Sequence, residues 1–375
     1  MLQALRQSLP PAPNDRLHGS VIAVSSQRDR IVVPMLEITQ SPLADARLTT
    51  PGIWFLGDYP KARLMAHWNQ RSFRLLQRTR VHLSPLVDAT TPASCRHLKG
   101  RGGVKGAVRS VYRALPRARF VARFDIRSYY ESLRHDVVLR QIAAAGADAA
   151  CQSVVGDYIR LPDRLGSGRG IVAGSFLSPL LGALYLAPLD RAMEQRVSQG
   201  RLVSYVRYMD DFVLLARTRW QLRRAIAEVH AVTGPIGLRM HPDKRFIGSL
   251  SRGFDFLGYQ FHPGRKLRPS GVSHRRLRER ARRLYEQGGD RQRLRLYVLR
   301  WWRWVHGGLG EGRSALVSRQ GGYERTWSQV RIHLDLHRPR ARTNAANCPL
   351  HEQAARGVWR HRFVFVVGML IRAGS

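Results

Sequence analysis

Acidic residues are scarce in this 375-residue chain, which has 26 Asp and Glu against 63 Lys and Arg and a net charge of +37. Lysine is scarcer still, because only five of the basic residues are lysine and the rest are arginine. This balance excludes the surface of an ordinary metabolic enzyme and indicates a polyanionic partner, with nucleic acid ahead of an anionic membrane. Arginine suits nucleic acid because its guanidinium group pairs with phosphate and stacks on bases.

Cysteine is also rare. Cys95, Cys151 and Cys348 are an odd number at wide spacing, which suits neither a disulfide framework nor a four-ligand zinc site. Cys348 lies among histidines whose spacing fits no standard zinc site, so we expect no zinc and a reducing, cytoplasmic location. These histidines are His333, His337 and His351.

Long apolar runs are nearly absent as well. Residues 171–189 carry no charge, but Pro179 and Pro188 interrupt them, so we expect a buried core segment and no membrane partner. Residues 1–16 lack the apolar core of a signal peptide. Both absences favour a protein of the cytoplasm.

Two segments place carboxylates at the ends of apolar strands. Residues 119–126 alternate in polarity, which predicts a strand with Asp125 near its end. Residues 202–216 predict two strands that meet at Asp210 and Asp211. Adjacent carboxylates in apolar surroundings need a cation beside them. That cation is either Arg207, in a purely structural interpretation, or Mg²⁺ held together with Asp125, as phosphoryl-transfer enzymes hold it.

The remaining periodicities predict the fold class. We expect a basic helix over residues 59–86, a buried helix over 175–189, a charged helix over 220–232 and a strand over 254–261. The order strand, helix, hairpin, helix, strand indicates an α+β fold, with an antiparallel sheet and helices on one of its faces. Residues 97–105 mix glycines with cations, which fits a phosphate-binding loop and a solvated loop equally well.

The carboxylate-bearing segments resemble motifs of the reverse transcriptases. Tyr208-Met209-Asp210-Asp211 resembles the family's Y-x-D-D motif, and four further motifs follow the family's order along the chain. They are Phe124–Leu133 (first palm motif), Gly170–Leu181 (the G-I-P-Q-G-S-P-L-S-P motif of bacterial members), Gly237–Lys244 (fourth motif) and Phe256–Tyr259 (primer grip). The chain therefore resembles bacterial reverse transcriptases of the group II intron, retron, diversity-generating or defence-associated types.

This resemblance implies a right-hand polymerase. Fingers and an N-terminal extension would occupy residues 1–118, and the palm residues 119–263, with a fingers insertion at about 134–168. A basic helical thumb would span residues 264–306, and a basic C-terminal tail residues 307–375. Three thumb tryptophans either pack its core or stack on bases. They are Trp301, Trp302 and Trp304.

The resemblance also implies roles for single residues. Asp125, Asp210, Asp211 and the backbone carbonyl of Ile126 would bind two Mg²⁺ ions, with Mn²⁺ as a substitute, and Lys244 would protonate the leaving pyrophosphate. Tyr130 would exclude the 2′-OH of a ribonucleotide. The alternative for Tyr130 is a packed aromatic of the core, and the alternative for Lys244 is an ordinary surface lysine. The nucleotide would be contacted by Lys99, Arg101, Lys105, Arg127, Ser128, Tyr129, Tyr130, Gly174 and Ser175. The primer would be held by Phe256, Leu257, Gly258 and Tyr259.

One departure from the family pattern concerns the nucleotide site. Val172-Ala173 stands where bacterial members carry Pro-Gln, so a side-chain amide that would touch the nucleotide is absent. We therefore expect unusual fidelity or template preference.

The implied function is RNA-directed DNA synthesis, in which dNTPs are added to a primer 3′-OH on an RNA template by two-metal phosphoryl transfer. The expected partners are the RNA template, a DNA or RNA primer, dNTPs and a cognate non-coding RNA, in a retroelement or an antiviral (phage) defence system. Three alternatives stay open: a template-independent nucleotidyltransferase, an RNA-directed RNA polymerase and a catalytically idle RNA-binding scaffold. Met209 and Tyr130 favour DNA synthesis, and the presence of all three aspartates argues against a scaffold.

Overall fold

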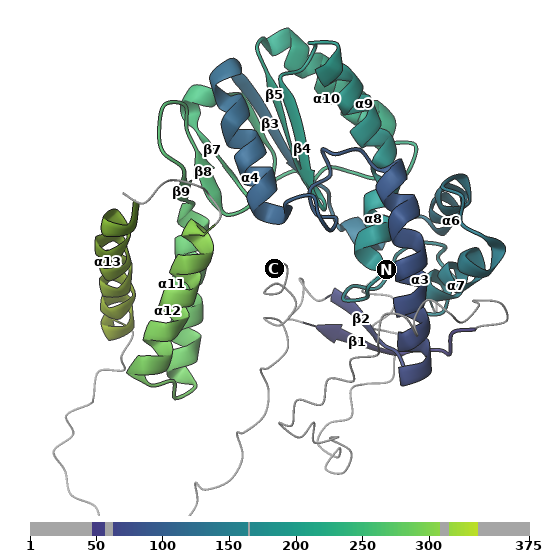
Figure 1. Cartoon of the computed structure of the whole chain (residues 1–375), viewed down its shortest axis with the longest axis horizontal. Coiled ribbons are helices and arrows are strands. Elements are labelled where there is room, and N and C mark those ends of the chain that lie inside the picture. The colour runs from purple at the N-terminus through teal and green to yellow at the C-terminus, as the bar shows by residue number, and fades with distance from the viewer. Residues whose placement is uncertain (1–46, 57–62, 164–165, 308–314, 337–375) are drawn as a thin grey trace, which may run out of the picture.

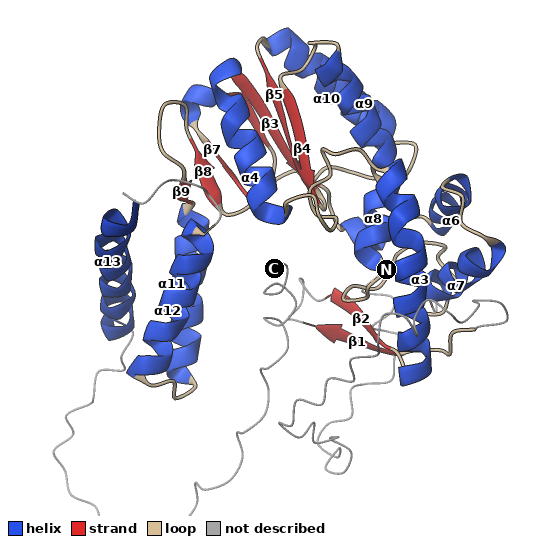
Figure 2. Ribbon diagram, viewed as in Figure 1, coloured by secondary structure: helices blue, strands red, loops and turns tan. Residues whose placement is uncertain are grey.

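The computed structural model describes residues 47–56, 63–163, 166–307 and 315–336 (Figure 1). Its centre is a four-stranded antiparallel sheet with the strand order β4-β5-β3-β6 (Figure 2). The strands are β3 (Phe120–Asp125), β4 (Ser204–Tyr208), β5 (Asp211–Ala216) and β6 (Phe246–Ser249). The predicted α+β class with an antiparallel sheet is confirmed.

Helices cover both faces of this sheet, whereas the sequence predicted one covered face. Ala122 and Phe124 of β3 belong to the core cluster that includes α10 (Arg219–Thr233), beside α9 (Ala187–Ser198). Val121, which precedes Ala122 and points to the opposite face, packs with α4 (Gly103–Ala114) in a second cluster. The glycine-rich start of α4 hid this amphipathic helix, so its coverage of the second face was missed.

A group of helices lies at one end of the sheet, beside a two-stranded sheet of β1 (Gly52–Leu56) and β2 (Arg63–His67) (Figure 1). The predicted helix over residues 59–86 begins only at Gln70, because Asn69 caps it by accepting a hydrogen bond from the Ser72 backbone N–H. The helices of this group are α3 (Gln70–Thr90), α6 (His135–Ala144), α7 (Ala149–Arg160) and α8 (Ser178–Tyr185).

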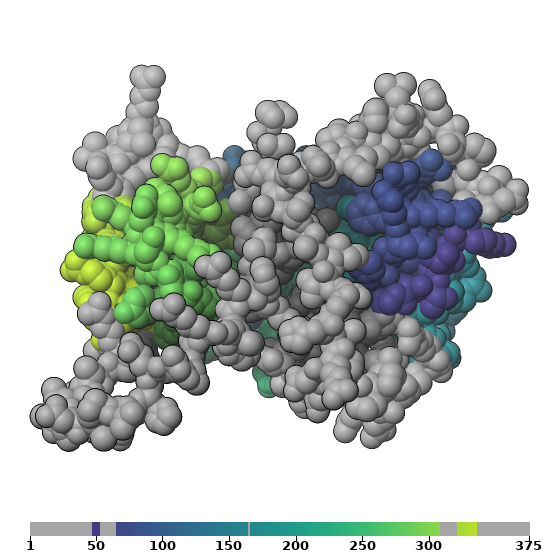
Figure 3. Space-filling model, turned by 90° about the horizontal axis from the view of Figure 1, so that it is seen from below, coloured from purple at the N-terminus to yellow at the C-terminus, as the bar shows by residue number. Residues whose placement is uncertain are grey.

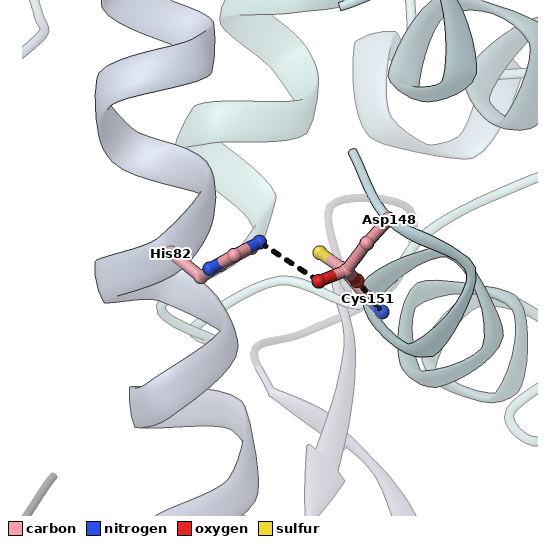
Figure 4. A group of neighbouring side chains, drawn as sticks. All are labelled: His82, Asp148 and Cys151. Atoms are coloured by element: carbon pink, nitrogen blue, oxygen red, sulfur yellow. Dashed lines mark hydrogen bonds and ion pairs between the residues drawn. The ribbon is translucent and has the colours of Figure 1, made fainter. Parts of the chain in front are cut away.

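The contact between α3 and α7 contains three side chains of metal-ligating types (Figure 4). His82 Nε2 lies 3.3 Å from one oxygen of Asp148, and the other oxygen caps α7 by accepting from the Cys151 backbone N–H at 2.7 Å. Burial, and the charge of Asp148, raise the pKa of the Cys151 thiol to about 12, so it remains protonated. One oxygen of Asp148 thus links α7 to α3, and the other caps α7.

Most of the uncharged run at residues 171–189 is buried, as predicted, and from Ser178 onward it forms α8 and the start of α9, whereas Gly174 is exposed. The two helices are separate since the chain turns at Leu186, and each begins with a proline in its first turn. Within the described ranges, none of the helices combines the length and the apolar character that crossing a lipid bilayer requires.

A second group of helices lies at the opposite end of the molecule (Figures 1 and 3). It consists of α11 (Gly271–Glu286), α12 (Arg291–His306) and α13 (Ala315–Leu336), below a small sheet of β7 (Phe254–Phe256), β8 (Tyr259–Phe261) and β9 (Arg268–Pro269). Part of the expected C-terminal tail is therefore helical, and Tyr323 and Trp327 of α13 pack against α11 and α12. Of the histidines and cysteine considered for zinc, His337, Cys348 and His351 lie outside the described residues.

Candidate active site

The β4–β5 hairpin carries two of the carboxylates at its turn. Tyr208 pairs with Asp211, so the turn itself consists of Met209 and Asp210. Met209 adopts the left-handed region, with φ of 59°, which a residue with a side chain seldom occupies. On the other side of β5, Asp125 is the direct partner of Asp211. The sheet therefore brings all three aspartates to one end of adjacent strands.

Burial, together with the negative charges of Asp210 and Asp125, raises the pKa of Asp211 to about 7. The cations that oppose this effect are Arg123 and Lys244, and the Lys244 ammonium lies 3.2 and 3.4 Å from the two oxygens of Asp125. A set of oxygen donors that repel one another fits a hard divalent cation, which prefers carboxylates. The three aspartates thus have the donor chemistry of a Mg²⁺ site.

Arg207 does not neutralise this carboxylate cluster by an ion pair. Its fully buried guanidinium pairs with Asp190, with Nε 2.7 Å from Oδ1, and Nη1 donates to the backbone carbonyl of Met209 at 2.9 Å. Its charge is therefore matched by Asp190, while it holds the turn by a hydrogen bond.

His97 is a residue of this site that the sequence interpretation missed. Its Nδ1 accepts the backbone N–H of Met209 at 3.1 Å, and its Nε2 lies 3.1 Å from the carbonyl of Pro179. Burial and the charge of Arg207 lower the pKa of His97 to about 3, so the ring is neutral. Its place in a segment of glycines and cations gave no signal of a contact so distant in sequence.

The chain after Asp125 turns into the one-turn helix α5 (Tyr129–Ser132). Tyr129 is buried, donates from its hydroxyl to the Gly182 carbonyl at 2.5 Å, and stacks on Tyr130 with ring centroids 5.6 Å apart. A Cβ atom at Gly182 would lie 3.2 Å from both rings, so this position admits the pair because it is glycine. Ile126 is buried, whereas Arg127 and Ser128 are exposed beside the aspartates.

Gly174 and Ser175 follow Val172 and Ala173, whose backbone groups bond to neighbouring elements. The Val172 carbonyl accepts from the hydroxyls of Tyr158 at 3.2 Å and Ser178 at 2.7 Å. Ala173 forms a β-bridge with Met65, and Gly174 has φ of 80° with the Met65 side chain beside it. The departure from the family motif is thus accompanied by packing against β2.

The three candidate cations, Lys99 and Arg101 before α4 and Lys105 within it, have different surroundings. Lys99 is exposed. Arg101 donates to the carbonyls of Thr91 and Pro92 and pairs with Asp88, which fixes the end of α3. Lys105 bonds the Tyr259 hydroxyl and the carbonyls of Trp304 and Val305. Arg101 and Lys105 therefore both make contacts within the fold.

The residues of the expected primer grip form a hairpin, where the sequence predicted one strand over residues 254–261. Leu257 and Gly258 have φ of 49° and 83° and make a two-residue turn between β7 and β8. Phe256 and Tyr259 flank the turn and are buried, and the Tyr259 hydroxyl donates to the Val305 carbonyl at 2.7 Å. The hairpin is thereby attached to the end of α12.

Comparison with known proteins agrees with this geometry. Residues 60–261 match the family described as reverse transcriptase (RNA-dependent DNA polymerase). Protein YkfC of Escherichia coli strain K12 is 25% identical over 179 residues, which cover 38% of this chain and 47% of that protein, about half of its length.

Similar solved structures include telomerases of two Candida species. The apo telomerase of Candida tropicalis has a TM-score of 0.48 at 10% identity, over 77% of this chain and 64% of that one. The Candida albicans telomerase, in complex with a TWJ fragment of telomeric RNA, has a TM-score of 0.43 at 12% identity, over 77% and 61%.

Proposed function

Because this chain belongs to the reverse transcriptase family, we propose that it is an RNA-directed DNA polymerase that adds dNTPs to a primer 3′-OH on an RNA template. The observation that carries the proposal is the strand register that sets Asp125 opposite Asp211, next to Asp210 in the hairpin turn. A structural turn would gain nothing from three converging carboxylates in a protein of net charge +37.

Asp125, Asp210 and Asp211, with the backbone carbonyl of Ile126, would hold two Mg²⁺ ions, for which Mn²⁺ can substitute. Such ions activate the primer hydroxyl and stabilise the leaving oxygen in phosphoryl transfer. The chain itself keeps the carboxylates in place through β3 and the hairpin. Lys244 would protonate the pyrophosphate oxygen that departs, and its ion pair with Asp125 supports this role.

The nucleotide would lie along the turn after Asp125, over the backbone of Arg127, Ser128 and Tyr129, with Gly174 and Ser175 on its other side. The stack of Tyr130 on the buried, hydrogen-bonded Tyr129 supports a role for Tyr130 as a steric gate against the 2′-OH. Lys99, which is exposed, would meet the triphosphate. Phe256, Leu257, Gly258 and Tyr259 would guide the primer.

The division into fingers (1–118), palm (119–263), thumb (264–306) and tail (307–375) extends this proposal to the whole chain. A cavity of about 580 Å³ at the junction of β8, β9 and the three C-terminal helices supports a thumb that grips nucleic acid. Arg268, Arg278, Arg325 and Trp302 line it, and none of its described lining residues is acidic. Phosphate contacts from such arginines would secure the template and primer. The wider context would be a retroelement or phage defence, with a cognate non-coding RNA.

Primer extension tests this function and separates it from its alternatives. Wild-type protein with Mg²⁺, an RNA template and dNTPs should give products whose sequence follows the template, and Asp210→Asn should give none. Products formed without a template would indicate a terminal nucleotidyltransferase, and equal use of rNTPs would indicate an RNA polymerase. Equal products from wild type and Asp210→Asn would refute the proposal.

The gate role of Tyr130 has its own test. Tyr130→Ala removes the ring that would meet a 2′-OH, so its preference for dNTPs over rNTPs should fall by about 10- to 100-fold. Tyr130→Phe keeps the ring and should keep the preference. The kcat/KM ratio for dGTP and GTP measures both, and an unchanged ratio in Tyr130→Ala would assign the ring to packing alone.

A further inference from the structure

We propose that His97 and Arg207 position the turn that carries Asp210 and Asp211, by binding both backbone polar groups of Met209, and that His97 acts as its neutral Nε2–H tautomer. This inference rests on the proposed function, because it concerns the same carboxylates. It names His97 as a positioning residue that lies outside the family motifs of the palm.

Met209 is held from two sides. Its N–H donates to His97 Nδ1 at 3.1 Å, and its carbonyl accepts from Arg207 Nη1 at 2.9 Å. A two-residue turn leaves its first peptide groups without strand partners, and a left-handed backbone at a residue with a side chain is disfavoured. The φ of 59° at Met209 is therefore maintained by these two side chains.

His97 is itself fixed at its other nitrogen. Nε2 lies 3.1 Å from the Pro179 carbonyl, which can only accept, so Nε2 carries the hydrogen and Nδ1 is left as the acceptor for Met209. The ring lies edge-on to Tyr208, with centroids 6.0 Å apart, and Cys95 Sγ is 3.4 Å from Nδ1. The contact with Pro179 ties the turn to the first turn of α8.

The charged groups around His97 favour this neutral state. Burial, Arg207 and Arg101 lower its pKa to about 3, while burial raises the pKa of the Cys95 thiol to about 11. A protonated ring would direct an Nδ1–H at the Met209 N–H and break the contact. The surroundings thus keep Nδ1 available as an acceptor across the working pH range.

Arg207 is also held by several hydrogen bonds. Two of its nitrogens bond Asp190, one of them also donates to the Ala183 carbonyl at 3.2 Å, and Tyr205 donates to Asp190 at 2.8 Å. The backbone beside it is joined to residues 94–96, through Arg207 N–H to the Ser94 carbonyl at 2.9 Å and Arg96 N–H to the Arg207 carbonyl at 2.8 Å. The segment that carries His97 is therefore in register with β4.

This arrangement has a consequence for metal binding. Asp210 and Asp211 directly follow Met209, so the orientation of that residue sets the direction of both carboxylates. Groups that orient metal ligands without touching the metal commonly change its affinity by 10- to 100-fold. His97 should therefore affect how tightly the aspartates bind a divalent ion, beyond any effect on folding.

Three substitutions separate the two hydrogen bonds of His97. His97→Asn places an amide oxygen near the position of Nδ1 and keeps an acceptor for Met209, whereas His97→Gln places its amide near Nε2 and keeps only the contact with Pro179. His97→Phe keeps the ring shape and loses both. Mn²⁺ binding, measured by electron paramagnetic resonance, should be nearly wild-type in His97→Asn and about 10- to 100-fold weaker in His97→Gln and His97→Phe.

A control for lost stability is Val154→Ala, which opens the core in α7, away from the turn. This variant should unfold at a lower temperature and yet bind Mn²⁺ as the wild type does. Wild-type Mn²⁺ affinity in His97→Phe, or an equal loss of affinity in Val154→Ala, would overturn the positioning role. Nitrogen-15 spectra of labelled histidine should show His97 protonated at Nε2 alone, and a proton at Nδ1 would also contradict it.

A separate variant tests the metal site on which this proposal rests. Asp210→Asn should lose Mn²⁺ affinity whatever the state of His97. If Asp210→Asn binds Mn²⁺ as tightly as the wild type, the proposed metal site itself is wrong.

Discussion

Asp211 stabilises the metal-free protein less than an uncharged residue would. Burial and the neighbouring Asp210 and Asp125 raise its pKa from 3.8 to about 7, so between these pH values the folded chain binds more protons than the unfolded chain. Stability must therefore fall as the pH rises through this window, and the full penalty is present above pH 7.

Asp211→Asn removes this penalty. At pH 8 and without Mg²⁺, its free energy of unfolding should exceed that of the wild type by an amount on the order of 2 kcal/mol. The gain should nearly vanish at pH 4, where the wild-type carboxyl is mostly protonated in the folded protein. Urea unfolding at both pH values measures the effect. A gain that is equal at pH 4 and pH 8 would show that the charge of Asp211 is not its cause.

The position of some site residues could be predicted from the sequence, and that of others could not. Asp125, Asp210 and Asp211 were predictable because alternation along a strand and an acidic pair between apolar strands are local patterns. His97 was not, because its partner Met209 lies 112 residues away and the contact depends on the docking of a loop against β4. Gly182 was missed for the same reason, since its role depends on two rings from α5.

At the scale of elements, Lys105 joins three of them. From α4 it bonds the Tyr259 hydroxyl on β8 and the carbonyls of Trp304 and Val305 at the end of α12, and its ammonium lies 4.7 Å from the centroid of the half-exposed Trp304 ring. Cations are favoured at the C-terminus of a helix, where carbonyls lack partners. This residue therefore holds α12 against the β7–β8 hairpin.

Lys105→Met should loosen that attachment. If α12 belongs to a thumb, the variant should still add the first nucleotide to a primer but should give products about tenfold shorter, because the duplex is released sooner. Lys266→Met, which removes the same charge from an exposed loop, is the matched control. Products are compared under single-encounter conditions with a trap. Wild-type product length in Lys105→Met, or equal shortening in Lys266→Met, would refute this role.

The wrong predictions of secondary structure have physical explanations. Residues 254–261 look like one strand because the turn signal is a single glycine, Gly258, after a leucine that adopts an uncommon positive φ. The helix expected from residue 59 starts at Gln70 because Asn69 caps it, and β2 precedes it. Trp301 and Trp302 pack, partly buried, against the C-terminal helices, whereas Trp304 is half-exposed.

At the scale of the whole molecule, the structure shows where acidic and basic residues of this chain of net charge +37 gather. A small acidic site lies at the end of the central sheet, and arginines line the cavity among the C-terminal helices. If that cavity contacts phosphate, binding of an RNA–DNA duplex must weaken steeply with salt, since each contact releases counterions.

The variant Arg278→Gln/Arg325→Gln tests this contact. Its affinity for duplex should fall, and the slope of log K against log salt should decrease in magnitude by about 1 to 2. Arg275→Gln/Arg276→Gln removes the same charge from exposed positions of α11 outside the cavity and should change the slope less. Fluorescence anisotropy over a range of salt concentrations gives both slopes, and identical changes in the two variants would show that the cavity has no special part.

The most direct test of the central claim is Mg²⁺-dependent addition of one dNTP to a primer on an RNA template, followed in a single turnover. Asp125→Asn should slow this step by about three orders of magnitude or more, with little change in affinity for the template and primer. Glu279→Gln, which removes an exposed negative charge from α11, should react at the wild-type rate. A wild-type rate in Asp125→Asn would contradict the assignment of the three aspartates as the catalytic site.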